Sequence, residues 1–124
     1  MILHVGSASV EQVRSALRQD TIVILEEDSG SYIQAGGGPW EYTVEARLVG
    51  AGGSFTHWKA RRSFVTGGAP RYVLIGEQAV KLDAAEVLPP EVALSLLANC
   101  LDGIRLAQGV EWAEISHWFE GDRL

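Results

Sequence analysis

The stretch from Glu41 to Val49 decides the predicted fold, and it reads EYTVEARLV. Apolar and polar side chains alternate along it, so every second residue points to the same side. The apolar positions are Tyr42, Val44, Ala46 and Leu48. A period of two residues is typical of a strand with one buried and one exposed face, which predicts an antiparallel strand here.

Glycine-rich turns flank this strand on both sides. Residues 50–53 read GAGG and lead into a second predicted strand over 54–64, which makes a hairpin with the first. Before it, a strand that begins at 32–35 is broken by GGGP at 36–39, because three glycines and a proline cannot easily sustain a paired ladder. Further strands are predicted over 1–6, 21–25 and 71–75. The middle of the chain is therefore predicted to be a meander.

Two segments have helical periodicity. Ser9 and Gln12 have the spacing of a capping box, and apolar residues follow at intervals of three and four. A second helix is predicted to begin near Pro90, because proline suits the first helical turn. The apolar stripe of this helix ends at Cys100. We expect Cys100 in the core, because a position among leucines provides neither the access nor the lowered pKa of a nucleophilic thiol.

The order of the elements predicts an α+β fold. Strand, helix, several strands, helix and strand are expected to form a single α+β domain over 1–124, with an antiparallel meander sheet and two main helices packed on one side. Residues 21–25 read TIVIL and are interpreted as a strand buried on both faces, because no alternation is visible. Residues 110–115 read VEWAEI and predict either a short strand or a last helical turn.

Composition excludes several classes of protein. Sixteen acidic residues against ten lysines and arginines give the 124-residue chain a formal charge of -6, which argues against nucleic-acid binding by a basic surface. One cysteine excludes an intrachain disulfide. No apolar run approaches the roughly 18 residues of a membrane span, and residues 1–5 lack the pattern of a signal peptide. We therefore expect a cytoplasmic protein that binds neither nucleic acid nor a membrane.

Motifs for catalysis, metals or nucleotides are not found in the sequence. The three histidines lack metal-ligand spacing, and there is no C-x-x-C. The glycine clusters lead into predicted strands and not into helices, which favours hairpin turns over phosphate loops. The basic cluster KARR at 59–62 is interpreted as a solvated strand face or as a partner of Glu41, Glu45 and other acids, and the alternative is a patch that binds an anionic partner. The sequence thus predicts no catalytic residue, no metal and no cofactor.

Charge is distributed unevenly along the chain. Residues 1–76 contain seven acids and seven bases, whereas residues 77–124 contain nine acids and three bases. Aromatic side chains lie among these acids, and aromatics anchor interfaces while acids steer a basic partner. The predicted partner-binding residues are Trp40 on its loop, Glu111, Trp112, Glu114, Trp118 and Glu120. The alternative for Trp112 is a place in the core.

Several stretches resemble immunity proteins of bacterial polymorphic toxin systems. They are SYIQA at 31–35, YTVE at 42–45 with His57 beyond it, and GVEWAEI at 109–115. The resemblance implies a non-catalytic inhibitor that binds a cognate toxin domain by protein–protein contact. It also implies that the toxin domain is often basic, because many such toxins act on nucleic acid.

Two other functions stay open at this point. A small acidic secretion chaperone or adaptor would bind an effector segment along a hydrophobic groove or a strand edge. A small enzyme would need a deep pocket that collects His57, Glu45 and Arg61. The leading interpretation is an immunity protein that is not an enzyme.

Overall fold

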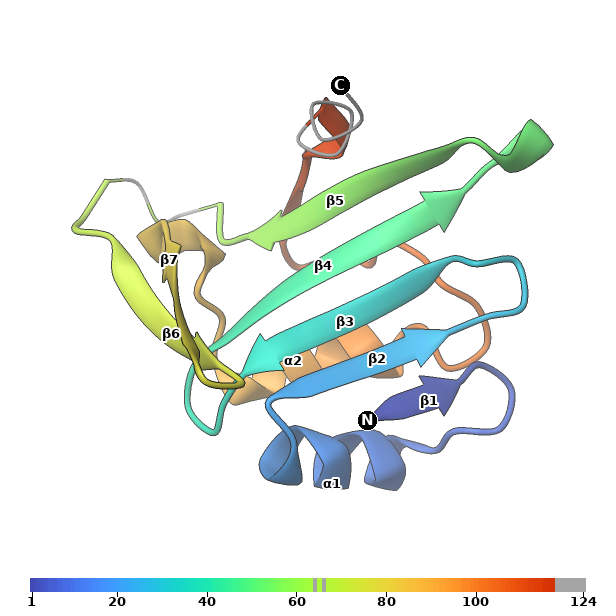
Figure 1. The fold of residues 1–124 in the computed structure, drawn as a ribbon, viewed down its shortest axis with the longest axis horizontal. Coiled ribbons are helices and arrows are strands. Elements are labelled where there is room, and N and C mark those ends of the chain that lie inside the picture. The colour runs from blue at the N-terminus through green and yellow to red at the C-terminus, as the bar shows by residue number, and fades with distance from the viewer. Residues whose placement is uncertain (64, 66, 118–124) are drawn as a thin grey trace.

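The computed structural model describes residues 1–63, 65 and 67–117. Its described part contains a six-stranded sheet, a two-stranded sheet and two α-helices (Figure 1). The large sheet has the order β1-β2-β3-β4-β5-β8 and is made of β1 (Ile2–His4), β2 (Ile22–Glu26), β3 (Tyr32–Gly37), β4 (Tyr42–Val49), β5 (Phe55–Arg61) and β8 (Glu111–Glu114). Two short 3₁₀ turns are η1 (Ala51–Gly53) and η2 (Ala84–Glu86). The predicted α+β fold is confirmed.

Strands β2 to β5 form the predicted antiparallel meander. Each pairs with the next one in the chain, and the predicted β4–β5 hairpin places Glu45 opposite Lys59. The exception is β1, which pairs with β2 in parallel because a helix connects the two strands. At the other edge, β8 lies antiparallel to β5, so the segment around Trp112 is a strand and not a helical turn.

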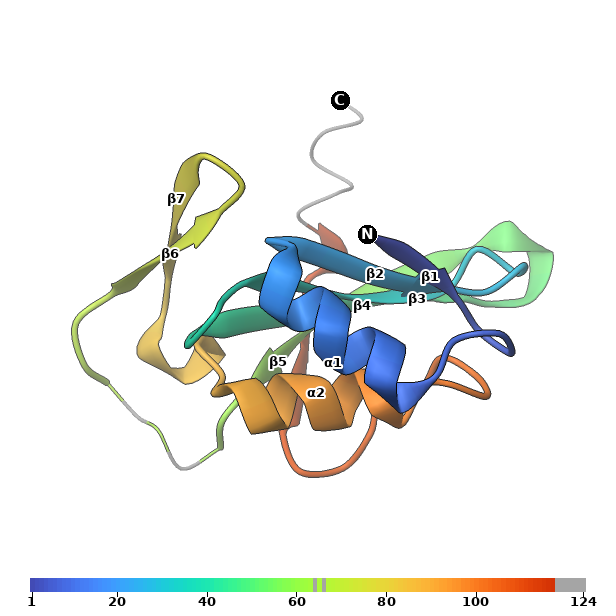
Figure 2. The ribbon, with the colours of Figure 1, turned by 90° about the horizontal axis from the view of Figure 1, so that it is seen from below.

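Both helices cover the same face of the large sheet, as predicted. They are α1 (Val10–Gln19) and α2 (Pro90–Ala98), and Figure 2 shows them side by side below the strands. The capping box of α1 is present: the Gln12 N–H donates to Ser9 Oγ at 3.2 Å, and the Ser9 N–H donates to Gln12 Oε1 at 2.8 Å. These bonds satisfy backbone donors that the first helical turn leaves unpaired, which explains where α1 begins.

The core lies between the helices and the sheet. On β4 the buried residues Tyr42, Val44 and Ala46 face the helices, which confirms the side predicted by the alternation. The largest fully buried side chains are Leu25, Ile33, Leu88, Leu96, Leu97, Val13, Val23, Val44 and Cys100. Burial of each large aliphatic side chain stabilises the fold by about 1.5–3 kcal/mol.

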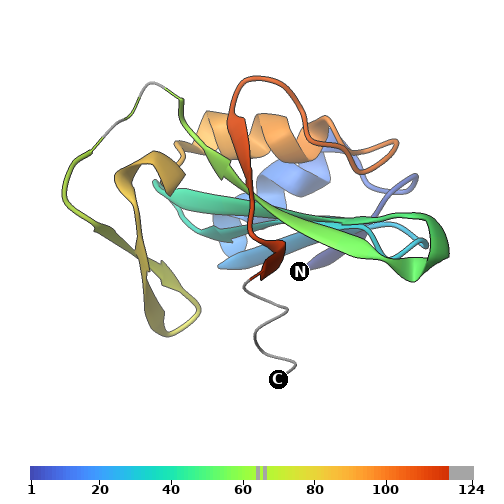
Figure 3. The same ribbon diagram turned by 90° about the horizontal axis from the view of Figure 1, so that it is seen from above.

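The prediction that β2 is buried on both faces is wrong. Val23 and Leu25 are buried in the core, but Ile22 on the opposite face is 42% exposed and Ile24 is only partly buried. Among the described residues, the helices cover one face of β2, and on the other face the hairpin of residues 71–82 lies only near Ile22 (Figure 3). An apolar strand without alternation can therefore still have one half-exposed face.

Strands β6 (Arg71–Ile75) and β7 (Gln78–Leu82) form a separate hairpin, which we call the hairpin arm. The predicted strand over 71–75 is confirmed. Its predicted place in the meander is wrong, because β6 pairs with β7 in a separate two-stranded sheet. The strand that pairs with the outer edge of β5 is β8. The arm projects from the sheet face opposite the helices (Figure 3). It is attached there by Val73 against Gly37 and by a hydrogen bond from the Gly76 N–H to Thr21 Oγ1 at 3.0 Å.

Candidate functional site

The turn between β3 and β4 presents Trp40 to solvent. The Gly38 N–H donates to the Glu41 carbonyl oxygen at 2.7 Å, which closes the turn around Pro39 and Trp40. Gly37 and Gly38 have φ values of +106° and +101°, a region that glycine adopts without steric cost. The Trp40 side chain is 78% exposed. The structure thus places this predicted anchor residue on the surface, in a turn held by the backbone.

The hairpin arm adds two more exposed apolar side chains, on the face of β6 opposite Arg71 and Val73. Tyr72 and Leu74 of β6 are 64% and 63% exposed. The Arg71 guanidinium forms an ion pair with the Glu41 carboxylate, which ties the arm to the Trp40 turn. Glu41 thus pairs with the hairpin arm, whereas the sequence suggested a pairing with the basic cluster of β5. Figure 1 shows the arm and the turn at the same end of the molecule, and we call Trp40, Tyr72 and Leu74 the Trp40 end.

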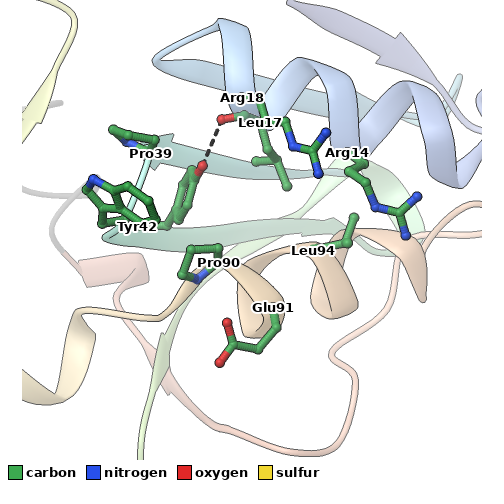
Figure 4. Close-up of a pocket in the computed structure, with 9 residues that line it drawn as sticks. Arg14, Leu17, Arg18, Pro39, Tyr42, Pro90, Glu91 and Leu94 are labelled. Atoms are coloured by element: carbon green, nitrogen blue, oxygen red, sulfur yellow. Dashed lines mark hydrogen bonds between the residues drawn. The ribbon is translucent and has the colours of Figure 1, made fainter.

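An apolar groove lies between α1 and α2 and continues from the Trp40 turn (Figure 4). We call it the α1–α2 groove; its volume is about 380 Å³. It is lined by Leu17, Pro39, Trp40, Tyr42, Pro90 and Leu94, with Arg14, Arg18 and Glu91 at its rims. The groove therefore shares Trp40 with the Trp40 end.

Tyr42 holds the floor of the groove in place. Its hydroxyl donates to the Leu17 carbonyl oxygen at 2.7 Å (Figure 4), one of the last carbonyls of α1, which lack helical partners. Its backbone exchanges two hydrogen bonds with Leu88, at 2.9 and 2.7 Å. Burial raises the pKa of the Tyr42 hydroxyl, and the nearby Arg18 offsets part of that rise. These contacts fix α1 and the segment before α2 to β4, so the groove is preformed.

The two rims of the groove carry opposite charges. Arg14 on α1 forms an ion pair with Glu11, one turn earlier in the same helix. Arg18, also on α1, is exposed, and its guanidinium forms no hydrogen bond or ion pair within the described part of the chain. Glu91 belongs to the first turn of α2 on the other side (Figure 4). The α1 rim thus has one cation without a neutralising partner among these residues.

The predicted binding residues of β8 lie elsewhere and do not form one patch. Trp112 is partly buried against the core, and its indole N–H donates to the Ala107 carbonyl oxygen at 2.9 Å, as expected for its alternative place in the core. Glu111 and Glu114 are exposed, but they are three positions apart in a strand and face opposite sides of the sheet. Strand β5 separates β8 from β4 and the Trp40 turn. The predicted residues Trp118 and Glu120 lie outside the described residues.

Two residues of the basic cluster, Lys59 and Arg61, form ion pairs on the sheet face opposite the helices. Lys59 is only 6% exposed, and its Nζ lies 3.5 Å from Glu45 Oε1 and 3.7 Å from Glu86 Oε2. Arg61 Nη1 lies 3.5 Å from Glu86 Oε2 and 3.4 Å from Asp83 Oδ2. The predicted pairing with Glu45 is confirmed. These pairs attach η2 to β5, and they neutralise two acids of the negatively charged last third.

The residues of the candidate enzyme site do not meet in one of the cavities found. Glu45 lines a cavity of about 120 Å³ under the hairpin arm, whereas Arg61 lines two others. His57 lines none of these; it is buried in edge-on contacts with Phe55 at 5.2 Å and Tyr32 at 6.5 Å between ring centres. Within 1–63, 65 and 67–117, no three His, Cys, Asp or Glu side chains are grouped closely enough to hold a metal ion.

Cys100 is a core residue, as predicted. Its thiol donates to the Arg105 carbonyl oxygen at 3.3 Å and accepts from the Arg105 N–H at 3.4 Å. Burial raises the pKa of the Cys100 thiol above its ordinary value. The thiol therefore supports the loop after α2 and is not an activated nucleophile.

Sequence reasoning missed Tyr72, Leu74 and Arg18. Val80 and Leu82 alternate with Lys81 shortly after Gly76, a signal that could have predicted β7 and hence a free-standing hairpin. No local signal distinguishes Arg18 from other helix-surface arginines. Its place on the groove follows from the packing of α1 against α2.

Comparisons with known proteins identify no relative of this chain. No protein-family model matches it, and neither a curated protein nor a solved structure is significantly similar. Neither described helix has the length and apolar character that crossing a membrane requires.

Proposed function

We propose that this chain is a cytoplasmic immunity protein, which binds a cognate bacterial toxin domain and blocks it by contact, without catalysing a reaction. The observation that supports this most is the Trp40 end. Among the residues that the structure describes, its members are the three most exposed large apolar side chains, and they come from two segments far apart in the sequence. Apolar surface exposed to water costs free energy, so three large exposed apolar side chains on segments at one end of the molecule favour an interaction site there.

The Trp40 end has the properties of a binding hot spot. Tryptophan and tyrosine are the residues that most often dominate interface energies. The closed turn and the Arg71–Glu41 pair hold the two segments in position before a partner arrives. A preorganised surface loses little conformational entropy on binding, which favours high affinity.

The negative net charge is proposed to act at longer range. A charge of -6 attracts a basic domain and raises its rate of association. The exposed carboxylates of Glu111 and Glu114 are proposed to contribute to this steering, although neither belongs to the Trp40 end. Contact affinity and electrostatic steering are thus assigned to different parts of the molecule.

The test uses the folded C-terminal toxin domain encoded by the neighbouring reading frame. We expect the purified chain to bind this domain and to protect cells that express it. Trp40→Ala should weaken binding about thirtyfold, since truncation of a hot-spot residue costs about 2 kcal/mol or more. The matched control is Ile2→Ala on β1, because Ile2 is apolar, 54% exposed and on the far edge of the sheet; it should change affinity less than about twofold.

Two outcomes would count against the proposal. One is a folded toxin domain that neither binds the chain nor is neutralised by it in cells. The other is binding only to an unfolded N-terminal segment of the neighbouring protein, which would favour a secretion chaperone that uses the α1–α2 groove for an extended chain.

A further inference from the structure

The α1–α2 groove has an apolar floor, and one of its two rims, the one formed by α1, carries positive charge. Leu17, Tyr42 and Leu94 provide apolar surface inside the groove, and the Tyr42 hydroxyl is already used by the Leu17 carbonyl. Arg14 and Arg18 follow each other by one turn of α1 and extend over this floor (Figure 4). The floor therefore suits an apolar side chain, and its α1 side suits an anion.

The two arginines of the α1 rim differ in their ion pairing. Arg14 is neutralised by Glu11, whereas Arg18 has no ion-pair partner among the described residues. A guanidinium with all of its donors free is a good partner for a carboxylate, because its planar fork matches the two carboxylate oxygens. The cation at the groove that can accept a new partner is thus Arg18.

Glu91 makes the α2 rim of the groove negative, so the two rims differ in charge. It stands on the α2 rim, opposite the arginines, and would repel a carboxylate placed on that side (Figure 4). An acidic ligand group is therefore favoured at the α1 rim and disfavoured at the α2 rim. Charge complementarity specifies both the kind of ligand and its orientation.

We propose that the α1–α2 groove binds a segment of the toxin domain in which an apolar side chain lies beside an Asp or Glu carboxylate. The apolar side chain occupies the floor between Leu17 and Leu94, and the carboxylate pairs with Arg18. A volume of about 380 Å³ is within the range of small-ligand pockets and suits a short segment of this kind. The inference rests on the proposed function and specifies the partner chemistry beside Trp40.

The test uses a small probe, so that it does not depend on the toxin domain. The full chain is titrated with N-acetyl-L-phenylalanine, a carboxylate at neutral pH, and with its neutral amide, while NMR signals of the Leu17 and Leu94 methyl groups and the Trp40 indole are followed. We expect the carboxylate to bind about two- to fivefold more tightly, the range expected for one exposed ion pair. Arg18→Gln should reduce its affinity to that of the amide, and Arg18→Lys should retain most of the preference.

The matched control is Arg105→Gln, since Arg105 is exposed and ion-paired with Asp102 but does not line the groove. Equal affinities for the acid and the amide, shifts outside the groove, or no shifts up to the solubility limit would overturn the inference. A concentration-dependent dimer that the probe dissociates would assign the groove to a second copy of the chain, and would overturn it too. If the probe binds as expected and the toxin domain does not bind, the proposed function fails while the ligand preference of the groove stands.

Discussion

Trp40 lies in the turn between β3 and β4, Trp112 lies in β8, and each is adjacent in sequence to a glutamate. Trp40 is largely exposed on its turn. Trp112 packs against the core, and its indole N–H is bonded to Ala107. The same side chain therefore serves different purposes in the two regions: at β8 it stabilises the fold, and at the Trp40 end it is available to a partner.

The difference arises from the backbone around each residue. The register of β8 places Trp112 opposite Ala60, a small core residue that leaves room for an indole on the helix side of the sheet. The Trp40 turn is closed by a hydrogen bond within the turn itself, and the Trp40 side chain is 78% exposed. Burial of Trp112 thus depends on pairing between strands far apart in the sequence, whereas exposure of Trp40 follows from a local turn.

The largest expected effect is a loss of stability when a side chain is added within the turn that presents Trp40. A Cβ at Gly37 would lie 2.6 Å from both the Glu41 carbonyl oxygen and Val73 Cγ1, in addition to a left-handed φ. Gly37→Ala should therefore lower the free energy of unfolding by about 3 kcal/mol. Gly52→Ala is the control, because Gly52 also has a positive φ but open space around it, and it should cost about 1 kcal/mol. Equal losses in urea denaturation would contradict this account of the turn.

The next prediction compares the two tryptophans directly. Trp112→Ala should lower the free energy of unfolding by about 2–3 kcal/mol, since it removes core packing and the hydrogen bond to Ala107. Trp40→Ala should change it by less than about 0.5 kcal/mol, because the side chain is mostly in water. Chemical denaturation of both variants measures the contrast. A large loss of unfolding free energy for Trp40→Ala would mean that Trp40 stabilises the fold, and would contradict its assignment to partner binding alone.

The smallest expected effect is a change of the free energy of unfolding with pH, caused by two buried groups of the core. Burial raises the pKa of Cys100 and Tyr42 above their ordinary values of 9.0 and 10.0. Above about pH 9 the unfolded chain loses these protons while the folded chain keeps them, so the free energy of unfolding should fall as pH rises through this range. Urea midpoints between about pH 8 and pH 10.5 measure the fall, and a combined Cys100→Ala and Tyr42→Phe variant should show a shallower one. An identical slope in that variant would contradict the assignment.

Local patterns predicted much of the fold. The alternation of β4, the capping box at Ser9 and the burial of Cys100 depend on residues close in sequence, and all three are confirmed. The outcome for β2 was different: residues 22–25 read IVIL and contain no polar residue to mark the half-exposed face, which depends on what packs against the sheet.

The candidate site was only partly predictable. Trp40 could be proposed because glycines and a proline precede it, which is typical of an exposed turn. Tyr72 and Leu74 could not, since their exposure depends on β6 pairing with β7 and leaving the main sheet. Arg18 acquires its place at the groove only through the packing of α1 beside α2.

The central claim is that the Trp40 end, and not the β8 edge, docks on the partner. Hydroxyl-radical footprinting of the free chain and of its complex with the folded domain encoded by the neighbouring reading frame measures this at the level of side chains. The account predicts that Trp40, Tyr72 and Leu74 lose most of their reactivity in the complex, while Trp112 keeps its already low value. Unchanged reactivity at the Trp40 end together with new protection along β8 would contradict it.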